Sequence, residues 1–333
     1  MQSQISMSIL GVCATKKNID PKWREFPKLL IDSGLNLVAC ESEIQNHHFD
    51  LEAYPHTLKF FGKSLDTKHR TLIRVEPVVV NPFQYQPSVE NKYGNIIVIS
   101  PCEAKTDRYI YWESGYIDFN LIKPTNTQLR SGTGMINNNK FSFVVGSNYK
   151  LRKKIIELFV ANDKLFKLAG KDWDKKIFWY LRKQASALLR VNLALSQVSP
   201  SQFQLPLSCN SSNFKYFGRV ESVISFLSEC KFAVVIENDS TYVSEKLLNA
   251  VIAGCVPIYH GPPLQSYGIP SSIAINLSDC SLDFLKAVET TSEFNCNQII
   301  KAGKNWIKSV ETQERWSVHK GFERLVKVMK SQL

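Results

Sequence analysis

The sequence contains no Cys-x-x-Cys pair, no repeat and no low-complexity tract, although it is 333 residues long and has eight cysteines. The cysteines stand singly at positions 13, 40, 102, 209, 230, 255, 280 and 296. This scatter argues against a zinc site and against a compact disulfide framework, and we expect several buried thiols. The 44% apolar and 21% charged composition is that of an ordinary folded protein. Its length predicts two domains of about 150 residues each.

Long hydrophobic runs are also missing. The first apolar stretch, Ile9 to Ala14, is interrupted by a glycine and followed by two lysines, so it is too short for a membrane span or a signal peptide. We therefore expect a soluble, cytoplasmic protein. The pair His47-His48 and the isolated His260 lack partners at metal-ligand spacing, which favours surface or packing roles.

Acidic residues are scarce in one segment. Lys150 to Arg190 holds twelve Lys and Arg against four Asp and Glu, a local charge of +8 in a chain of net charge +11. A positive region attracts a nucleotide diphosphate, an anionic membrane surface or a nucleic acid, and charge alone does not choose among them. A helix with a solvated basic face explains the charge equally well.

The order of apolar runs indicates an α/β protein with mostly parallel sheets. Short runs bounded by Pro, Gly, Asn or Ser predict buried strands at Ile9–Ala14, Leu35–Cys40, Thr71–Val75, Asn95–Ile99 and Phe141–Val145. We expect a helix at about Pro21–Ser33 and a helical region from Lys150 to Leu195, because apolar residues recur there at helical spacing. A loop should follow at Gln197–Asn213.

A βαβ unit is expected in the second half, with strands Phe232–Ile236 and Val256–Tyr259 around a helix at Ser244–Ala253. Backbone amides and the helix dipole make the start of this helix an anion site, and Lys246 adds a full positive charge. A cation there is unfavourable for the helix unless an anion arrives. Glu245 can accept hydrogen bonds from sugar or ribose hydroxyls. The alternative is a Glu that complements the dipole beside a solvated Lys.

The same region carries a family resemblance. Lys231 to Lys246 reads KFAVVIENDSTYVSEK, and Ala253 to Gly261 reads AGCVPIYHG. These segments resemble the donor-binding motif of the α-1,3-fucosyltransferase family, with Lys-Phe, Glu-Asn, Tyr-Val-Thr-Glu-Lys, Ala-Gly and Val-Pro-Ile in this order. Phe226–Ser228, and Phe141–Asn148 followed by Arg152, extend the resemblance. The matched motifs cover roughly a quarter of the chain.

The resemblance implies a GT-B fold, in which two Rossmann-like domains face each other across a cleft. We expect an N-terminal acceptor-side domain at 1–138 and a C-terminal donor-binding domain at 139–333. The implied activity is inverting, metal-independent transfer of fucose from GDP-fucose to a glycan or lipid-linked saccharide acceptor, with an α-1,3 linkage. No cofactor is implied apart from this donor substrate.

Three alternatives remain open. Another GDP-sugar donor is the nearest, because Asp239 stands where the family has Ser and the loop from Asn238 to Tyr242 is about two residues shorter. A basic nucleic-acid-binding protein would explain the charge but not the motif, so we expect no nucleic-acid partner. A non-catalytic sugar-binding relative would bind the donor without transfer.

The resemblance assigns donor binding to six residues, namely Arg152, Arg219, Asn238, Tyr242, Glu245 and Lys246. Glu245 and Lys246 would contact the sugar and the diphosphate. Arg152, with Arg219 as the weaker candidate, would supply a second cation, since a fixed cation stabilises the charge that develops on departing GDP. The alternative for Arg152 is one more charge on a solvated helix.

An inverting transferase also needs a base for the acceptor proton. Glu76 follows the strand expected at Thr71–Val75, and the carboxyl ends of such strands hold ligand-facing groups in α/β proteins. We assign Glu76 as the base, against the alternative of a surface carboxylate, with Glu113 in reserve. Asp172-Trp173-Asp174 resembles the metal motif of other glycosyltransferases. It lies in a basic stretch with no preceding apolar strand, so we expect no metal there.

Overall fold

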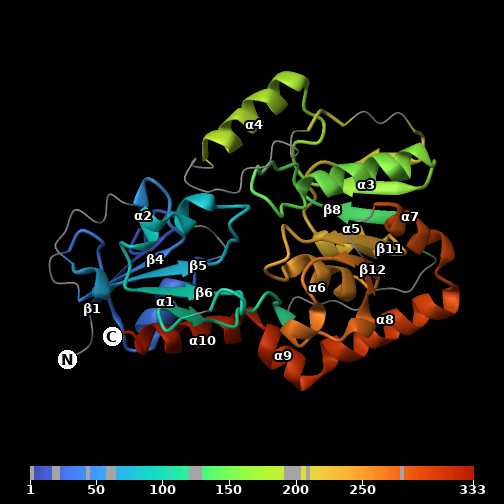
Figure 1. Ribbon diagram of the computed structural model, residues 1–333. Coiled ribbons are helices and arrows are strands. Elements are labelled where there is room, and N and C mark those ends of the chain that lie inside the picture. The colour runs from blue at the N-terminus through green and yellow to red at the C-terminus, as the bar shows by residue number, and fades with distance from the viewer. Residues whose placement is uncertain are drawn as a thin grey trace. The chain divides into compact units, whose positions relative to one another are not determined.

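The computed structural model describes residues 4–16, 23–42, 46–57, 65–104, 106–119, 130–190, 204–207, 211–277 and 281–333. They form two compact units (Figure 1). One contains the described residues of Met1–Gly115 together with Arg190 and Arg315–Leu333, and the other contains the described residues of Tyr116–Leu189 and Gln197–Glu314. Each unit has its own largely parallel sheet, so the expected two-domain α/β fold is confirmed.

The described residues of the N-terminal unit form a sheet of seven strands. They are β1 (Gln4–Ile9), β2 (Val12–Cys13), β3 (Asn36–Val38), β4 (His47–Leu51), β5 (Arg70–Arg74), β6 (Asn95–Val98) and β7 (Tyr109–Tyr111). The order is β2-β1-β4-β5-β6-β7, with β3 also paired to β1. The β1–β2 pair is antiparallel and the others are parallel. β4 and β5 are buried along their whole length, as inner strands of a parallel sheet are.

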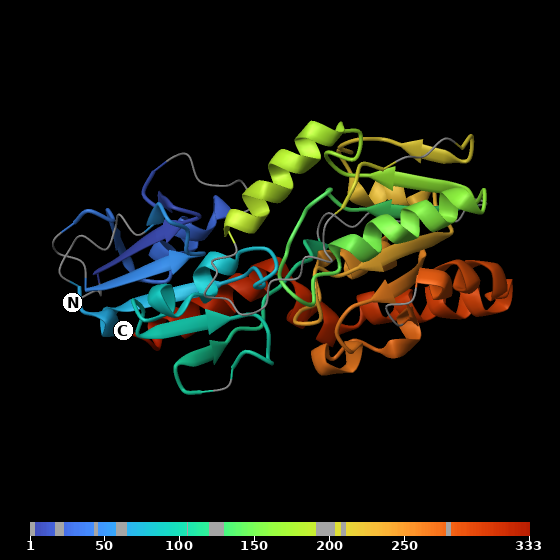
Figure 2. The ribbon, with the colours of Figure 1, turned by 45° about the horizontal axis from the view of Figure 1, so that its top comes forward.

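The last helix of the chain completes this unit. Helices α1 (Phe26–Asp32), α2 (Pro87–Glu90) and α10 (Val318–Lys330) belong to it. Apolar residues of α10 join the core formed by α1 and the sheet, and Figure 2 shows this red helix beside the blue and teal strands. The α10 residues in this core are Leu325, Val326 and Met329.

In the described part of the C-terminal unit, six parallel strands form the second sheet: β8 (Thr133–Ile136), β9 (Phe166–Ala169), β10 (Phe214–Tyr216), β11 (Phe232–Ile236), β12 (Val256–His260) and β13 (Ile275–Asn276). The order β10-β9-β8-β11-β12-β13 is the 3-2-1-4-5-6 order of a Rossmann fold. The strand order reverses between β8 and β11, and ligands of such sheets bind at the carboxyl ends of the strands at this point.

Helices cover both faces of this second sheet, with α3 on one side and α6 on the other (Figure 1). The helices are α3 (Tyr149–Ala161), α4 (Ile177–Arg190), α5 (Val223–Ser228), α6 (Glu245–Ile252), α7 (Ser281–Thr290) and α8 (Glu293–Lys308), followed by α9 (Val310–Trp316) at the junction with the first unit. Opposite faces are expected, because right-handed crossovers that leave β8 and β11 in opposite directions place their helices on opposite sides.

The observed division of the chain differs from the expected boundary at 138/139. Strand β8 (Thr133–Ile136) lies in the second sheet, and α10 (Val318–Lys330) lies in the first unit. The physical reason is the apolar face of α10, which is buried in the core of the first unit. A boundary drawn once along the chain cannot represent a C-terminal helix that returns to the N-terminal core.

Several element predictions are confirmed to within one or two residues. They are the strands at Thr71–Val75, Asn95–Ile99, Phe232–Ile236 and Val256–Tyr259, and the helix at Ser244–Ala253. The strand expected at Leu35–Cys40 is shortened to Asn36–Val38, and the helix expected at Pro21–Ser33 is seen from Phe26 to Asp32. Residues 17–22 and most of the loop expected at Gln197–Asn213 lie outside the described residues.

Three element predictions are wrong. Ile9–Ala14 is the end of one strand, a turn and the start of the next, because Gly11 takes a left-handed conformation with φ +81°. Phe141–Val145 is not a strand; the preceding Thr133–Ile136 is. The region from Lys150 to Leu195 is not continuously helical, since the buried strand β9 separates α3 from α4.

The expected buried thiols are confirmed at five positions, which are Cys13, Cys40, Cys230, Cys255 and Cys296. Cys102 is exposed, and positions 209 and 280 lie outside the described residues. His47 and His48 are buried between strands, where Thr71 and Asp50 are among their partners, so they have the packing role. Of the described helices, none has the length and hydropathy needed to cross a membrane.

Candidate functional site

A buried carboxylate joins the carboxyl end of β11 to the start of α6. Glu237 follows β11 and has no exposed surface. Its Oε1 accepts a hydrogen bond from the Ser244 amide at 2.9 Å, and its Oε2 accepts one from Ser244 Oγ at 2.6 Å. Ser244 is the N-cap of α6, and its hydroxyl accepts from the Lys246 amide. These hydrogen bonds hold the βα turn of the motif. Glu237 was not among the predicted site residues, although it directly precedes the predicted Asn238 in the motif.

Lys246 forms an ion pair with this carboxylate. Its Nζ lies 3.0 Å from Glu237 Oε2 and 2.7 Å from Ser244 Oγ, and its side chain is 19% exposed. The expectation of an uncompensated cation at the helix start is therefore wrong, because Glu237 supplies the anion. An ammonium group has three donors, and these two contacts leave one for a ligand.

Arg152, Asn238 and Tyr242 form a second buried cluster beside the first. An Arg152 guanidinium nitrogen donates to Ile236 O and to Asn238 Oδ1, both at 2.8 Å. The Asn238 amide donates in turn to the Tyr242 hydroxyl at 2.8 Å. Arg152 comes from α3 after β8, and Asn238 follows β11, so the cluster lies where the strand order reverses.

Burial decides between the two interpretations of Arg152. The residue is 2% exposed, so it is not a solvated charge on a basic helix. Desolvation lowers the pKa of its guanidinium, and desolvation likewise raises the pKa of the nearby Asp239 carboxyl. Arg152 Nε and Asp239 Oδ2 are buried without a hydrogen-bond partner within the described chain. Such atoms cost free energy, on the order of 1–3 kcal/mol each, until a partner arrives.

The two remaining donor candidates are more exposed. Glu245 is the first residue of α6 and is exposed at its start. Arg219 is exposed after β10, which lies two strands away from β8 in the sheet. Among the described residues, no hydrogen bond or ion pair joins Arg219 to the Glu237 and Asn238 clusters. The structure therefore brings together Arg152, Asn238, Tyr242 and Lys246 more closely than it does Arg219.

In the N-terminal unit, Glu76 follows β5 at the carboxyl edge of the sheet and is half-buried. Glu52, directly after β4, accepts hydrogen bonds at its Oε1 from the amides of Val75 at 2.7 Å and Glu76 at 2.8 Å. Its Oε2 accepts from the Asn81 side chain at 2.8 Å. Glu52 thereby holds the backbone of the candidate base.

Glu52 is itself an unusual residue. It has no exposed surface, and its φ of 62° is left-handed, a conformation that costs about 1–2 kcal/mol in a residue with a side chain. Desolvation raises its pKa from 4.5 to about 7, and the charge of Glu76 adds to the effect. Glu52 was not predicted as a site residue, although its place after the strand His47–Leu51 matches that of Glu76 after the neighbouring strand.

The carbonyl side of Glu76 is held as firmly as its amide. Gln84 Nε2 and the Tyr85 hydroxyl donate to Glu76 O at 2.9 and 3.1 Å. Behind them, the buried Arg74 forms ion pairs with Glu90 at 2.6 Å and Glu103 at 3.4 Å, and its guanidinium lies 3.8 Å from the Tyr85 ring centre. The backbone at this position is thus fixed from both sides.

The reserve candidate Glu113 is placed differently. Its carboxylate lies 2.7 Å from Arg315 Nε, and its carbonyl accepts from Arg324 Nε at 3.0 Å. These contacts join the end of the N-terminal segment to the C-terminal helices of the same unit. Their geometry favours a structural role for Glu113.

The Asp172-Trp173-Asp174 segment follows strand β9 (Phe166–Ala169), so the expectation that no strand precedes it is wrong. Trp173 is buried and donates to Asn137 O at 2.6 Å, while Asp174 lies 3.9 Å from Lys175. In the parts of the chain that the structure describes, no three His, Cys, Asp or Glu side chains are grouped to hold a metal ion. Metal independence stays a prediction.

The fold of this chain is similar to that of several solved structures. It is similar to a crystallised alpha1,3-fucosyltransferase, with a TM-score of 0.55 and 12% identity over 99% of this chain and 91% of that one. It is equally similar to Anabaena Alr3699/HepE in complex with UDP-glucose, with a TM-score of 0.56 and 10% identity over 94% of this chain and 84% of that one. The fold is that of the GT-B glycosyltransferases, as the motif implied.

The relatives found by sequence belong to a narrower class than the neighbours found by fold. The chain is 25% identical over 215 residues to 4-galactosyl-N-acetylglucosaminide 3-alpha-L-fucosyltransferase 9 of Homo sapiens and of Cricetulus griseus. The match covers 61% of this chain and 56% of those relatives, so it spans about half of their length. No family model matches the chain. The resemblance to the α-1,3-fucosyltransferases is thus confirmed as distant homology.

Proposed function

We propose that this protein is an inverting glycosyltransferase that moves fucose from GDP-fucose to a hydroxyl of a glycan or lipid-linked saccharide. The observation that carries the proposal is the cluster at the reversal of the second sheet, where Lys246, Arg152, Asn238 and Tyr242 converge around the start of α6. A helix N-terminus with two nearby cations is suited to a diphosphate. Distant homology to α-1,3-fucosyltransferases supports fucose and the α-1,3 linkage.

In this proposal the donor site acts on the leaving group. The bond between the anomeric carbon and the diphosphate breaks, and its electron pair stays on the departing GDP. Lys246 and Arg152 stabilise the negative charge that develops there, as fixed cations do in a partly buried site. Glu245 accepts hydrogen bonds from sugar or ribose hydroxyls. No step requires a metal ion.

Glu76 acts on the acceptor in the same proposal. Its carboxylate takes the proton from the acceptor hydroxyl while the oxygen forms the new bond to the anomeric carbon. Glu52 is a positioning residue, because it fixes the Glu76 amide and its neighbour through two hydrogen bonds. The proposed base and the proposed donor cluster belong to different units.

The acceptor class is supported by the basic region. Helix α4 exposes apolar side chains, with Phe178 81% exposed and Leu181 and Leu188 nearly half exposed. Exposed Arg182 and Lys183 lie on the same helix. Apolar and basic side chains together favour peripheral contact with an anionic membrane surface, which suits a lipid-linked acceptor better than a nucleic acid. Cytoplasmic localisation remains a prediction.

Thermal shift with GDP, UDP, ADP and their sugars, in buffer with a chelator, tests donor binding. A ligand that binds only the folded state raises the melting temperature with the logarithm of its concentration over its dissociation constant. We expect the largest shifts with GDP and GDP-fucose. Equal shifts with UDP, or a strict need for Mn²⁺ or Mg²⁺, would contradict the proposal, and a larger shift with a different GDP-sugar would change the donor.

Glu76→Gln tests the chemistry. The amide keeps the size of the side chain but cannot take the acceptor proton, so donor affinity should persist while turnover falls by about a hundredfold to ten-thousandfold. Glu113→Gln is the matched control and should retain turnover. If only the control loses transfer, the base is Glu113; if both variants stay active, the acceptor-side assignment fails. If the native protein binds the donor but shows neither transfer nor slow donor hydrolysis, it is a non-catalytic sugar-binding relative.

A further inference from the structure

The C-terminal unit has a concave site at the edge of its sheet opposite to the donor cluster. A cavity of about 590 Å³ lies at the amino ends of the parallel strands. Arg130 comes before β8, Lys231 directly before β11 and Gly254 before β12, and all three line it. Glu237 and Asn238 lie at the other end of β11, so a whole strand separates the cavity from the proposed donor site.

Positive charge dominates this cavity. Five of its lining side chains are Lys or Arg: Arg130, Lys231, Lys301, Lys304 and Lys308. Its only carboxylate among the described lining residues is Glu293, which is already in an ion pair with Lys231. Among the described lining residues, cations therefore outnumber carboxylates by five to one.

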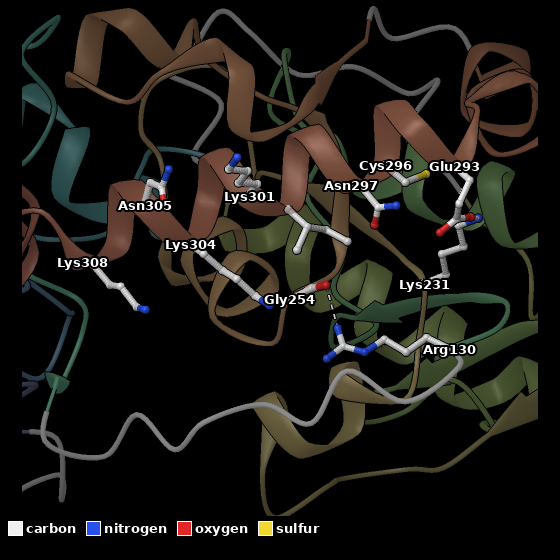
Figure 3. Close-up of a pocket in the computed structure, with 11 residues that line it drawn as sticks. Arg130, Lys231, Gly254, Glu293, Cys296, Asn297, Lys301, Lys304, Asn305 and Lys308 are labelled. Carbon is white, nitrogen blue, oxygen red and sulfur yellow. Dashed lines mark hydrogen bonds and ion pairs between the residues drawn. The ribbon is translucent and has the colours of Figure 1, made fainter.

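The cations converge from two sides. The Arg130 guanidinium is held by hydrogen bonds to Ala253 O at 2.8 Å and Gly254 O at 2.6 Å. Figure 3 shows Lys304 extending from α8 toward Gly254, with Lys308 one turn further along the same helix. Like charges four residues apart destabilise a helix by roughly 0.2–0.5 kcal/mol per pair, and an anion between these groups would remove that cost.

We propose that this cavity binds a small phosphate-bearing anion through Arg130, Lys304 and Lys308, outside the transfer reaction. A guanidinium fixed in place and ammonium groups on flexible stems are the side chains that bind phosphate oxygens. The Asn297 amide adds a neutral donor to the lining. The volume lies within the roughly 300–1,000 Å³ of small-molecule sites, which favours a compact ligand over an extended nucleic acid.

The test is a titration of inorganic pyrophosphate followed by thermal shift, on the full chain at fixed ionic strength. K304E/K308E removes the site, and K154E/K286E is the control, since it makes the same charge change at exposed lysines of α3 and α7. We expect the pyrophosphate dissociation constant to rise at least about tenfold in K304E/K308E and to stay unchanged in the control. Lys246→Ala should keep the pocket-dependent shift, because it alters the opposite edge of the sheet.

Sedimentation with vesicles containing phosphatidic acid separates the two sources of the phosphate. Vesicle binding that K304E/K308E loses and the control keeps identifies a lipid headgroup, and a pyrophosphate effect alone identifies a soluble ligand. Equal losses in both double variants would overturn the proposal, since they would show a response to net charge only. Loss of RNA retention specific to K304E/K308E, without any pyrophosphate effect, would overturn it as well. GDP affinity should be unchanged in K304E/K308E, so failure here is distinct from failure of the proposed function.

Discussion

The pKa of Glu52 predicts a measurable pH dependence of stability. Burial raises this pKa from 4.5 to about 7, so the folded state holds the proton more tightly than the unfolded chain between these values. The free energy of unfolding is therefore greatest, for this group, below pH 4.5, and it falls as the pH rises through 7. A tenfold difference in proton affinity corresponds to about 1.4 kcal/mol, so the loss of unfolding free energy between pH 5 and 8 comes to about 2–3 kcal/mol.

Urea denaturation of native protein and Glu52→Gln from pH 5 to 8 measures this effect. The variant cannot ionise, so its free energy of unfolding should fall less with pH than that of the native protein, by about 2–3 kcal/mol over this range. Turnover should fall as well, because the amide replaces an acceptor by a donor opposite Asn81 and disturbs the hold on Glu76. Parallel pH profiles for the two proteins would refute the reasoning, whatever their absolute stabilities.

Three further variants test the contacts directly. Lys246→Ala should weaken GDP binding by about tenfold or more in calorimetry. It should also lower the melting temperature, since Glu237 stays buried without its cation. The control Lys286→Ala should change neither the GDP affinity nor the melting temperature. Arg152→Met should lower the free energy of unfolding measured in urea by about 3 kcal/mol, because two buried acceptors lose their donor. An unchanged free energy of unfolding would show that these two hydrogen bonds do not stabilise the fold. Gly115→Ala should destabilise the docking of α10, since its Cβ would lie 1.8 Å from Ser317 O, whereas Ser114→Ala should not.

The donor half of the site could be predicted from the sequence because its signals are local. A buried strand, a polar turn, an N-cap Ser and a helix with a Gly stop are contiguous from Phe232 to Gly254, and the structure has each of them. The local pattern could not show which group forms an ion pair with the Lys246 ammonium. Its partner Glu237 lies nine residues earlier, and only the folded turn brings the two together.

The arrangement of the rest was decided by tertiary structure. Strand β8 (Thr133–Ile136) is short and begins with Thr-Gly, so its hydropathy does not mark it; it is a strand because β9 and β11 pair with it on both sides. The sequence left open whether Arg152 is a solvated surface charge. In the folded chain it is buried and donates hydrogen bonds to residues 84 and 86 positions away.

By itself, the sequence determined the α/β class, the βαβ unit around α6 and the resemblance to α-1,3-fucosyltransferases, because these depend on periodicity, caps and contiguous motifs. Only the tertiary structure decided that Glu52 holds Glu76 and that α10 (Val318–Lys330) completes the N-terminal core. Those contacts join residues far apart along the chain. Their energy comes from burial and hydrogen bonds that exist only after both segments are in place.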